Sequence, residues 1–359
     1  MRVAYDWGPV LGRGDGRAEI TGVGRYTRAL AIALEAAGVE VVRYAVALRG
    51  SPEQGRDVVR VRAPARLAQA GWQAMGGPAI ERFTGPVDIV HATNFVLPPL
   101  RRARGVVTVH DLSFWRGDTF PGGKRLRSLV PWSVERAAAV IVPTRAIAVE
   151  LTGRLDVAPE RVAVTPEGVA DSFFGATPLG DLALQRMGIS RPFALAVGTL
   201  EPRKNLLRLL RAWEAVADSM QQWTLVLAGP KGWGPGLPAT RNVVPIGWVG
   251  DETLPGLLAA SELFCYPSLY EGFGLPPLEA MATGTACLVG RYSAAEEVLG
   301  AAALLVDPTD VGAIASGLEA LTDPKARRRR ELIGKARAAE FTWARCARAT
   351  MEVYATALS

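Results

Sequence analysis

The sequence predicts an α/β protein with two doubly wound parallel sheets. Short, continuous apolar runs alternate with helical patterns along the whole chain, which indicates parallel strands covered by helices on both faces. The length of 359 residues fits two such domains of about 170 residues each. Because crossovers between parallel strands are right-handed, each half should form its own Rossmann-like sheet.

In the first half, six apolar runs are expected to form strands. Helical patterns separate several of them, for example at Tyr26–Ala37 and Ser133–Ala139. The runs are Val3–Trp7, Val39–Val46, Val87–His91, Val106–His110, Val140–Pro143 and Val162–Thr165.

In the second half, six more runs alternate with helices. The expected strands are Phe193–Val197, Trp223–Leu227, Val243–Ile246, Leu263–Tyr266, Ala286–Val289 and Ala303–Val306. The expected helices are Leu206–Ser219, Glu252–Ala260, Leu278–Thr283, Val311–Thr322 and a last one over Phe341–Leu358.

A stretch rich in Gly and Pro, Gly168–Arg191, separates the two halves. We therefore assign residues 1–180 to a first Rossmann-like domain, 181–340 to a second, and 341–359 to a C-terminal helix. Ligands of such sheets bind outside the carboxyl ends of the strands, so functional residues should follow strands or begin helices.

The composition excludes several classes of protein. The chain has three Cys without CxxC spacing and only two His, which argues against a disulfide scaffold and against a zinc or histidine-rich metal site. No apolar stretch approaches the ~18 residues of a membrane span, and the N-terminus does not resemble a secretory signal. There is no zinc-finger spacing or RNA-binding aromatic motif. We expect a cytoplasmic, reduced protein without a nucleic-acid partner.

The excess positive charge lies in the first half. The whole chain has a formal net charge of +6, and residues 1–180 hold 23 Lys and Arg against 17 Asp and Glu. Four cations, Lys124, Arg125, Arg127 and Arg136, are interleaved with apolar residues. This pattern indicates a basic amphipathic helix suited to an anionic membrane surface; the alternative is an ordinary solvated helix face.

The segment Gly198–Asn205 follows one expected strand and precedes a helix. Arg203 and Lys204 therefore lie at a helix N-terminus, where the helix dipole disfavours cations. A diphosphate in the same space would make this placement favourable. The alternative is a solvated pair of cations with Glu201 as its partner.

The segment Tyr266–Met281 also follows a strand. Gly272 and Gly274 allow a ligand to approach backbone N–H groups. Pro277 suits the first helical position, which would put Glu279 in the first turn. Glu271 and Glu279 could accept hydrogen bonds from the paired hydroxyls of a ribose or hexose, although a helix dipole alone could account for Glu279.

Two further candidate segments lie in the first half. After the Gly-rich loop Gly12–Gly16, a helix opens with Gly22, Val23, Gly24 and Arg25, but it lacks the third Gly of a dinucleotide motif. Its N–H groups suit a phosphate or an acceptor. His110 ends a strand at the expected ligand edge, as does His91; the alternative for His110 is a hydrogen-bonded structural role.

Taken together, these segments resemble glycosyltransferase family 4. The most specific element is the pair Glu271 and Glu279 within Tyr266–Met281, followed by Gly198–Asn205. The resemblance covers nearly the whole chain. It implies the GT-B fold, in which two Rossmann-like domains face a cleft and the C-terminal helix crosses back to the first domain. The first domain would bind the acceptor and the second the nucleotide-sugar donor.

The resemblance also implies transfer with retention of configuration, without a metal or cofactor. It assigns catalytic roles at the donor diphosphate and sugar to Lys204, Arg203, Glu271 and His110. It assigns donor binding to Gly198, Thr199, Gly272, Phe273, Gly274, Leu275 and Glu279, with Glu279 on the ribose. It places Gly22, Val23, Gly24 and Arg25 in the acceptor or phosphate loop. The chain departs from the family pattern at Thr199, where many members have Arg, and at Glu167, where many have Asn.

The Pro-Arg-Lys-Asn and His-Asp-Leu patterns most resemble bacterial mannosyltransferases of surface-polysaccharide assembly. This implies GDP-mannose as the donor and a saccharide or lipid-linked acceptor at the inner face of the membrane. The alternative is glucosyl or rhamnosyl transfer from a UDP- or dTDP-sugar to a soluble small molecule. A nicotinamide-dependent oxidoreductase would need a Gly-x-Gly-x-x-Gly motif directly after a strand. A binding protein with a degenerate site would have lost the Glu or Lys positions.

Overall fold

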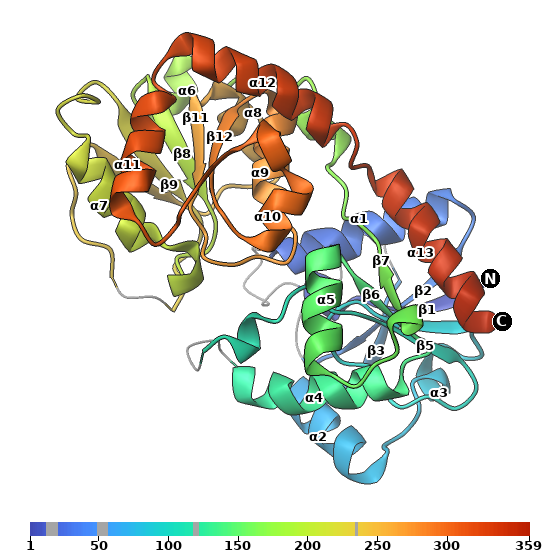
Figure 1. Ribbon diagram of the computed structural model, residues 1–359. Helices are drawn as coiled ribbons and strands as arrows, with labels where there is room; N and C mark the ends of the chain where they lie inside the picture. Colours follow the sequence, from blue (N-terminus) through green and yellow to red (C-terminus); the bar gives the residue numbers. More distant parts are fainter. Residues whose placement is uncertain (12–20, 49–56, 118–121, 234–235) are drawn as a thin grey trace. The chain divides into compact units, whose positions relative to one another are not determined.

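A computed structural model describes residues 1–11, 21–48, 57–117, 122–233 and 236–359, and the chain divides into two compact units (Figure 1). Unit 1 comprises Met1–Gly168 and Thr342–Ser359, and unit 2 comprises Val169–Phe341. Residues 169–180, which the sequence analysis placed in the first domain, thus belong to unit 2. The loop Gly12–Gly16 lies outside the described residues.

Within its described residues, unit 1 contains a seven-stranded sheet in the order β3-β2-β1-β4-β5-β6-β7. All neighbouring strands are parallel, and the strand order reverses between β1 and β4. The short strand β3 was not predicted. The strands are β1 (Arg2–Asp6), β2 (Glu40–Val46), β3 (Val59–Val61), β4 (Ile89–Ala92), β5 (Arg104–Thr108), β6 (Ala139–Val142) and β7 (Val162–Val164).

The main core of unit 1 lies between the sheet and two helices from opposite ends of the chain, α1 and α13. The helices α4 and α5 lie on the side of the sheet away from α1 (Figure 1). The helices are α1 (Gly22–Ala36), α2 (Ala65–Met75), α3 (Glu81–Thr84), α4 (Gly123–Arg136), α5 (Arg145–Arg154) and α13 (Trp343–Leu358).

The described part of unit 2 contains a six-stranded parallel sheet in the order β10-β9-β8-β11-β12-β13. Its order reverses between β8 and β11. The strands are β8 (Phe193–Val197), β9 (Thr224–Ala228), β10 (Val243–Gly247), β11 (Leu263–Tyr266), β12 (Ala286–Gly290) and β13 (Leu304–Val306).

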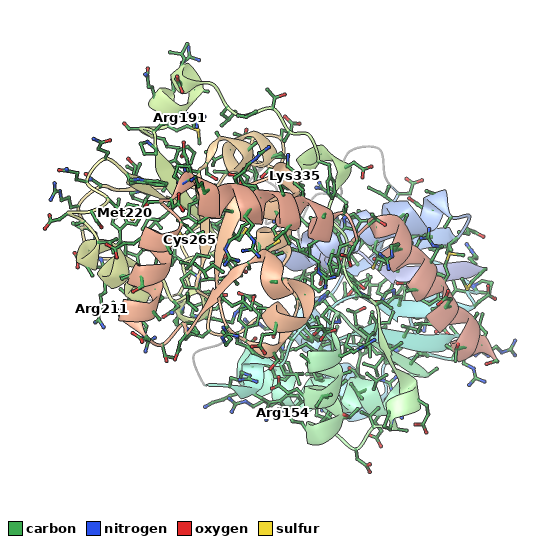
Figure 2. All side chains as sticks on the ribbon, turned by 45° about the horizontal axis from the view of Figure 1, so that its top comes forward. Arg154, Arg191, Arg211, Met220, Cys265 and Lys335 are labelled. Carbon is green, nitrogen blue, oxygen red and sulfur yellow. The ribbon has the colours of Figure 1, made fainter. Side chains whose placement is uncertain are left out.

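The core of unit 2 lies between one face of this sheet and the helices α7 and α11. Cys265 of β11 lies among the side chains of the sheet, whereas Arg211 of α7 extends from the surface (Figure 2). The helices are α6 (Asp181–Arg186), α7 (Leu206–Ala215), α8 (Leu254–Ala260), α9 (Leu275–Thr283), α10 (Ser293–Val298), α11 (Val311–Ala320) and α12 (Pro324–Ala338).

The helix predicted at Ser133–Ala139 is wrong at both ends. Helix α4 begins ten residues earlier, at Gly123, and ends at Arg136, because Ala139 already belongs to the buried strand β6. Throughout the described ranges, no helix is both long and apolar enough to cross a membrane.

Candidate functional site

The two most specific sequence segments meet in unit 2 where the strand order reverses. Gly198 follows β8 and Pro267 follows β11, and these two strands are direct neighbours in the sheet. In an open parallel sheet the crevice for a ligand forms at this point, outside the carboxyl ends of the strands. The topology therefore places Gly198–Asn205 beside the segment that contains Glu271.

Asn205 fixes the two loops to each other. It has a left-handed backbone, with φ of 60°, and joins the 3₁₀ turn Pro202–Lys204 to α7. Its Nδ2 donates to the carbonyl oxygens of Pro267, at 3.0 Å, and of Pro308, at 2.6 Å. The N–H of Leu269 donates to the carbonyl of Arg203 at 2.9 Å. Hydrogen bonds to the backbone of Pro267, Pro308 and Leu269 therefore fix the turn that carries Arg203 and Lys204.

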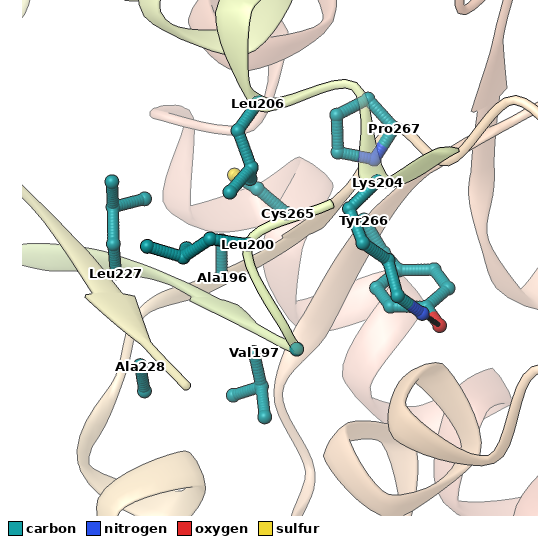
Figure 3. Close-up of a pocket in the computed structure, with 11 residues that line it drawn as sticks. Ala196, Val197, Leu200, Lys204, Leu206, Leu227, Ala228, Cys265, Tyr266 and Pro267 are labelled. Atoms are coloured by element: carbon teal, nitrogen blue, oxygen red, sulfur yellow. Dashed lines mark hydrogen bonds between the residues drawn. The ribbon is translucent and has the colours of Figure 1, made fainter. Parts of the chain in front are cut away.

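Both predicted cations converge on Glu271. Lys204 Nζ lies 2.8 Å from Glu271 Oε1 and donates to the Tyr266 hydroxyl at 2.6 Å. Arg203 pairs with the other oxygen of Glu271 and, at 2.7 Å, with Glu201. Figure 3 shows the tips of Lys204 and Tyr266 side by side at the wall of a small, mainly apolar pocket.

The charges in this cluster stabilise one another. Burial alone would raise the pKa of Glu271, but Arg203 and Lys204 overcome it and lower that pKa to about 2. Burial lowers the pKa of Lys204, and the Glu271 carboxylate opposes this effect. Burial also raises the pKa of Tyr266, so its phenol stays protonated. The result is an ionised, pre-positioned cluster at the ligand edge of the sheet.

Gly198 lies directly against the Lys204 side chain. It has φ of 150°, and a Cβ atom there would come within 3.2 Å of Lys204 Cε. A side chain at this position would therefore crowd the lysine stem. Thr199, the neighbour that departs from the family pattern, follows it in the same loop. The cation of this loop is supplied instead by the Arg203 and Lys204 pair.

Helix α9 begins at Leu275, two residues before the predicted start at Pro277. Glu279 therefore lies in the second turn rather than the first, and a dipole effect does not explain it. Its side chain is buried, with 4% of the residue exposed. Gly272, Phe273, Gly274 and Leu275 form the approach to this helix, and Gly274 takes φ of 104° as its N-cap.

Tyr292 was not predicted from the sequence as a site residue. A Cβ on Gly274 would lie 3.4 Å from the Tyr292 hydroxyl, and this buried oxygen has no hydrogen-bond partner in the described structure. Burial, together with the nearby Glu271, raises the pKa of Tyr292. No motif marks this tyrosine, because it follows a different strand, β12, and only the fold brings it to Gly274.

In unit 1, the predicted loop residues Gly22 to Arg25 form the first turn of α1. The N-cap Thr21 accepts a hydrogen bond from the N–H of Gly24 at 3.3 Å. Gly22 is exposed and Gly24 is buried. These four residues belong to unit 1.

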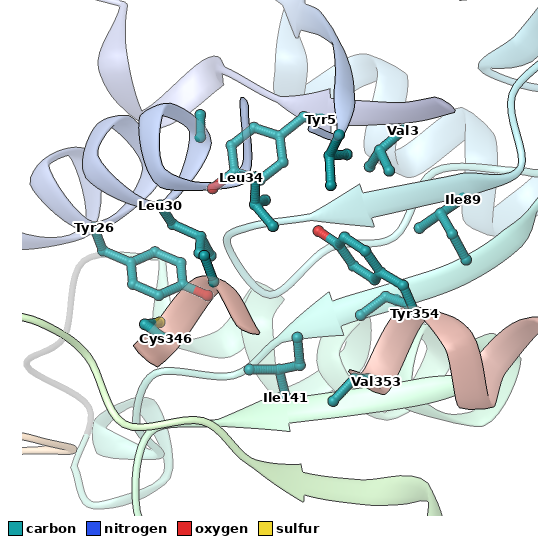
Figure 4. Packing of buried hydrophobic residues seen from close by; sticks show 14 of the residues in the cluster. Val3, Tyr5, Tyr26, Leu30, Leu34, Ile89, Ile141, Cys346, Val353 and Tyr354 are labelled. Atoms are coloured by element: carbon teal, nitrogen blue, oxygen red, sulfur yellow. The ribbon is translucent and has the colours of Figure 1, made fainter. Parts of the chain in front are cut away.

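The two histidines have different environments. His91 is fully buried; its ring nitrogens lie 2.6 Å from the Tyr354 hydroxyl and 2.8 Å from Thr108 Oγ1. Burial lowers the pKa of His91 to about 3, so its role is structural. Figure 4 shows that Tyr354 of α13 points into the same core as Tyr26 of α1.

His110 lies at the ligand edge, as predicted, and is 7% exposed. Its Nε2 is 2.8 Å from the carbonyl oxygen of Thr93, and its Nδ1 is 3.4 Å from Glu167 Oε1. Both ring nitrogens thus face protein groups. Glu167, which the sequence analysis noted only as a departure from the family pattern, is its direct neighbour.

The predicted basic amphipathic stretch forms most of helix α4. Its apolar positions Leu129 and Val130 are buried. Arg127 donates to the carbonyls of Phe114 and Gly117, at 2.8 and 3.0 Å, and Arg136 lies over the Trp132 ring. Lys124 is exposed. Arg127 and Arg136 therefore have contacts within the unit, and Arg125 has two buried guanidinium nitrogens.

Sequence profiles of two families match the chain. The profile described as "Glycosyltransferase Family 4" matches residues 20–173, and "Glycosyl transferases group 1" matches residues 191–323. O-antigen chain mannosyltransferase B of Escherichia coli is 32% identical over 74% of this chain and 74% of its own length. Serotype-specific mannosyltransferase WbdA of Escherichia coli is 31% identical over 61% of this chain, which spans only 29% of WbdA.

A solved structure gives an independent comparison of the fold. Sucrose-phosphate synthase from Thermosynechococcus elongatus superposes with a TM-score of 0.75 at 20% identity, covering 99% of this chain and 98% of that one. This likeness, with the two parallel sheets and the C-terminal helix in unit 1, confirms the predicted GT-B fold.

Proposed function

The chain belongs to glycosyltransferase family 4, and we propose that it is a metal-independent, retaining hexosyltransferase that uses GDP-mannose. Its acceptor would be a saccharide or lipid-linked saccharide in cell-surface polysaccharide synthesis. Its relatives, O-antigen chain mannosyltransferase B and serotype-specific mannosyltransferase WbdA, support mannose as the sugar and a cell-surface polysaccharide as the product. The observation that carries the proposal is the cluster of Arg203, Lys204 and Glu271 where the strand order of unit 2 reverses.

We propose that Arg203 and Lys204 bind the donor diphosphate. Negative charge develops on the leaving diphosphate as the bond to the sugar breaks, and two fixed cations stabilise it without the reorganisation that solvent would need. Their ion pairs with Glu271 and Glu201 hold them in place before the donor arrives. These side chains would supply the charge that a metal ion supplies in other transferases.

The remaining contacts with the nucleotide-sugar donor would be made at the same edge of the sheet of unit 2. Glu279 would accept hydrogen bonds from the ribose hydroxyls, and the backbone from Gly272 to Leu275 would approach the phosphate and sugar. The acceptor hydroxyl would attack on the face that the leaving group departs from, and the leaving phosphate oxygen would take its proton. This route retains the configuration and needs no protein nucleophile.

We also propose that unit 1 contacts an anionic membrane surface, with the protein on the cytoplasmic side. The supporting observations are the excess of positive charge in residues 1–180 and the exposed Lys124 at the start of α4. A lipid-linked acceptor presented at such a surface would then meet the enzyme there.

The first test is a calorimetric titration of the purified protein with GDP, UDP and dTDP in the presence of EDTA. Selective binding of GDP supports a GDP-sugar donor and metal-independent binding of the diphosphate. Selective binding of UDP or dTDP overturns the mannose assignment in favour of a glucosyl or rhamnosyl donor. Failure of all three to bind contradicts the proposed donor site.

A further inference from the structure

We infer that His110 and Glu167 hold one proton between them, on Nδ1 of His110, and that Glu167 is a positioning residue for this histidine. The pair lies in unit 1, where His110 follows β5 and Glu167 follows β7. Both side chains are more than nine-tenths buried. The inference rests on which atoms face each nitrogen of the ring.

The carbonyl of Thr93 determines the state of Nε2. This carbonyl lies 2.8 Å from Nε2 and has no hydrogen to donate, so Nε2 must carry one. Thr93 itself is held in place, because its Oγ1 donates to the carbonyl of Asp6 at 2.9 Å and accepts from Thr27 Oγ1 at 3.2 Å. A His110 tautomer without hydrogen on Nε2 therefore could not form a hydrogen bond to the Thr93 carbonyl.

The other nitrogen then faces a carboxylate. In a neutral ring with hydrogen on Nε2, Nδ1 has only a lone pair, and Glu167 Oε1 lies 3.4 Å from it. Two acceptors in a buried site repel each other unless a hydrogen lies between them. Because imidazole is a stronger base than a carboxylate, that hydrogen belongs on Nδ1.

The other titratable groups around the pair do not provide the negative charge that faces Nδ1 of His110. The Tyr26 ring packs edge-on against His110, with ring centroids 4.6 Å apart, and burial raises the pKa of Tyr26 well above its usual value. Cys346, on α13 near Glu167, also has a pKa raised by burial. His91 has a pKa of about 3. Asp111, adjacent to His110, accepts from the N–H of Ser113. Among the residues that the structure describes, Glu167 is thus the acid that contacts Nδ1.

The functional consequence rests on the proposed transferase activity. With both N–H groups bound to protein, the His110 ring has a fixed orientation and no lone pair, so it cannot act as a base. The ring then shapes the site without accepting a proton. Raising the pH until the pair loses its proton would leave Nδ1 and the carboxylate in repulsion and release the ring. Transfer should then fall on the alkaline side of the pH profile.

The experiment is nitrogen NMR of the full chain labelled with ¹⁵N-histidine, recorded across a pH series for wild type, Glu167→Gln and Glu167→Asp. The chain has only two histidines, so the two ring systems are readily distinguished. His91 is the internal control: its neutral ring signals should be the same in all three proteins, which shows that unit 1 remains folded. In the wild type, His110 should show hydrogen on both nitrogens at low pH and lose the one on Nδ1 as the pH rises.

The expected result is that Glu167→Gln moves this loss to lower pH, while Glu167→Asp moves it less. The same midpoint in wild type and Glu167→Gln, or a wild-type ring with hydrogen on Nδ1 but not on Nε2, overturns the inference. Hydrolysis of GDP-mannose to GDP and mannose, with water as the acceptor, is measured over the same pH series as the second readout. Its alkaline limb should shift in the same direction in Glu167→Gln, and an unshifted limb overturns the positioning role. If the wild type does not bind GDP or GDP-mannose in calorimetry, the proposed donor is wrong, while the NMR result still decides the shared proton.

Discussion

In the described residues, the two sheets share one strand order over six strands, with a seventh strand in unit 1, but the pKa of a carboxyl group is shifted in opposite directions at their ligand edges. In unit 2 the edge holds full charges: Arg203 and Lys204 are paired with Glu271, whose pKa falls to about 2. In unit 1, burial instead raises the pKa of Asp6, at the end of β1, to about 6. Burial thus has opposite net outcomes for a carboxyl group at the two edges, because among the described residues cations lie beside Glu271 but not beside Asp6.

This difference gives the two units opposite responses to acid. Glu271 has a folded pKa below its usual value, so it stabilises unit 2 above about pH 4.5, and this contribution is lost as the pH falls toward about 2. Asp6 has a folded pKa above its usual 3.8, so unit 1 loses stability as the pH rises from about 4 to about 6. The following experiments test this contrast, from the largest expected effect to the smallest.

Replacing Lys204 by Ala should have the largest effect on transfer. Removal of a buried cation from a developing anion typically costs about 100- to 1000-fold in rate. Initial rates of sugar transfer from GDP-mannose would measure the loss, and thermal unfolding would show that the variant is folded. Lys325→Ala is the matched control, because Lys325 is exposed on α12 of the same unit. A folded Lys204→Ala enzyme with the wild-type rate would remove the basis for treating unit 2 as the anion site.

Replacing Glu279 should weaken binding of the donor nucleotide rather than the chemical step. Loss of a hydrogen bond to a charged group costs roughly 10- to 100-fold in affinity. Calorimetry with GDP would measure this for Glu279→Ala and for the isosteric Glu279→Gln, which preserves packing around this buried side chain. Glu214→Ala, on the exposed face of α7, is the control. Unchanged GDP affinity in both Glu279 variants would refute the ribose contact.

Removing charge from α4 should reduce binding to anionic vesicles several-fold, at about 1 kcal/mol for each cation near the surface. The variant is Lys124→Gln with Arg125→Gln; Arg127 is kept because it bonds to the Phe114 carbonyl. Co-sedimentation with phosphatidylglycerol vesicles measures binding. Removing the same charge from α12 of unit 2, with Lys325→Gln and Arg329→Gln, should change it little. Equal losses in the two double variants would mean that the charge asymmetry between the halves has no role in membrane contact.

Replacing Asp6 by Asn should give a small gain in stability that depends on pH. The amide keeps an oxygen that can accept from the N–H of Gly8, as Asp6 Oδ1 does at 2.9 Å, but it never has to ionise. The melting temperature should exceed that of the wild type by a few degrees above pH 6, with no gain below about pH 4. Scanning calorimetry at pH 4 and pH 8 would test this. A gain that is equal at both values would show that ionisation of Asp6 is not the cause.

The fold was largely predictable because buried parallel strands have a local signature. The runs Phe193–Val197 and Leu263–Tyr266 have the same bounds as β8 and β11. The start of α9 was misplaced because Pro276 and Pro277 are both compatible with a first turn, and Gly274 rather than Pro277 sets its beginning. Short β3 has too few residues for a periodic signal.

The chemistry of the site was only partly predictable. Motif spacing brought Arg203, Lys204 and Glu271 to attention, but the sequence analysis gave the cations a diphosphate or Glu201 as partner, not Glu271. The ion pairs join residues that are 67 and 68 positions apart and form only when β8 lies beside β11. The same holds for His110 and Glu167, which are 57 positions apart. Contacts of this kind depend on sheet order, which no local pattern contains.

The division of unit 1 between the two ends of the sequence has a consequence for biosynthesis. A ribosome completes residues 169–341 before it adds 342–359, so the later unit has all of its chain while the earlier one still lacks α13. Until then, the core positions that Cys346, Val353 and Tyr354 fill against α1 are unoccupied. The core of unit 1 is therefore complete only when the last segment of the chain packs against α1, whereas no described part of unit 2 depends on that segment.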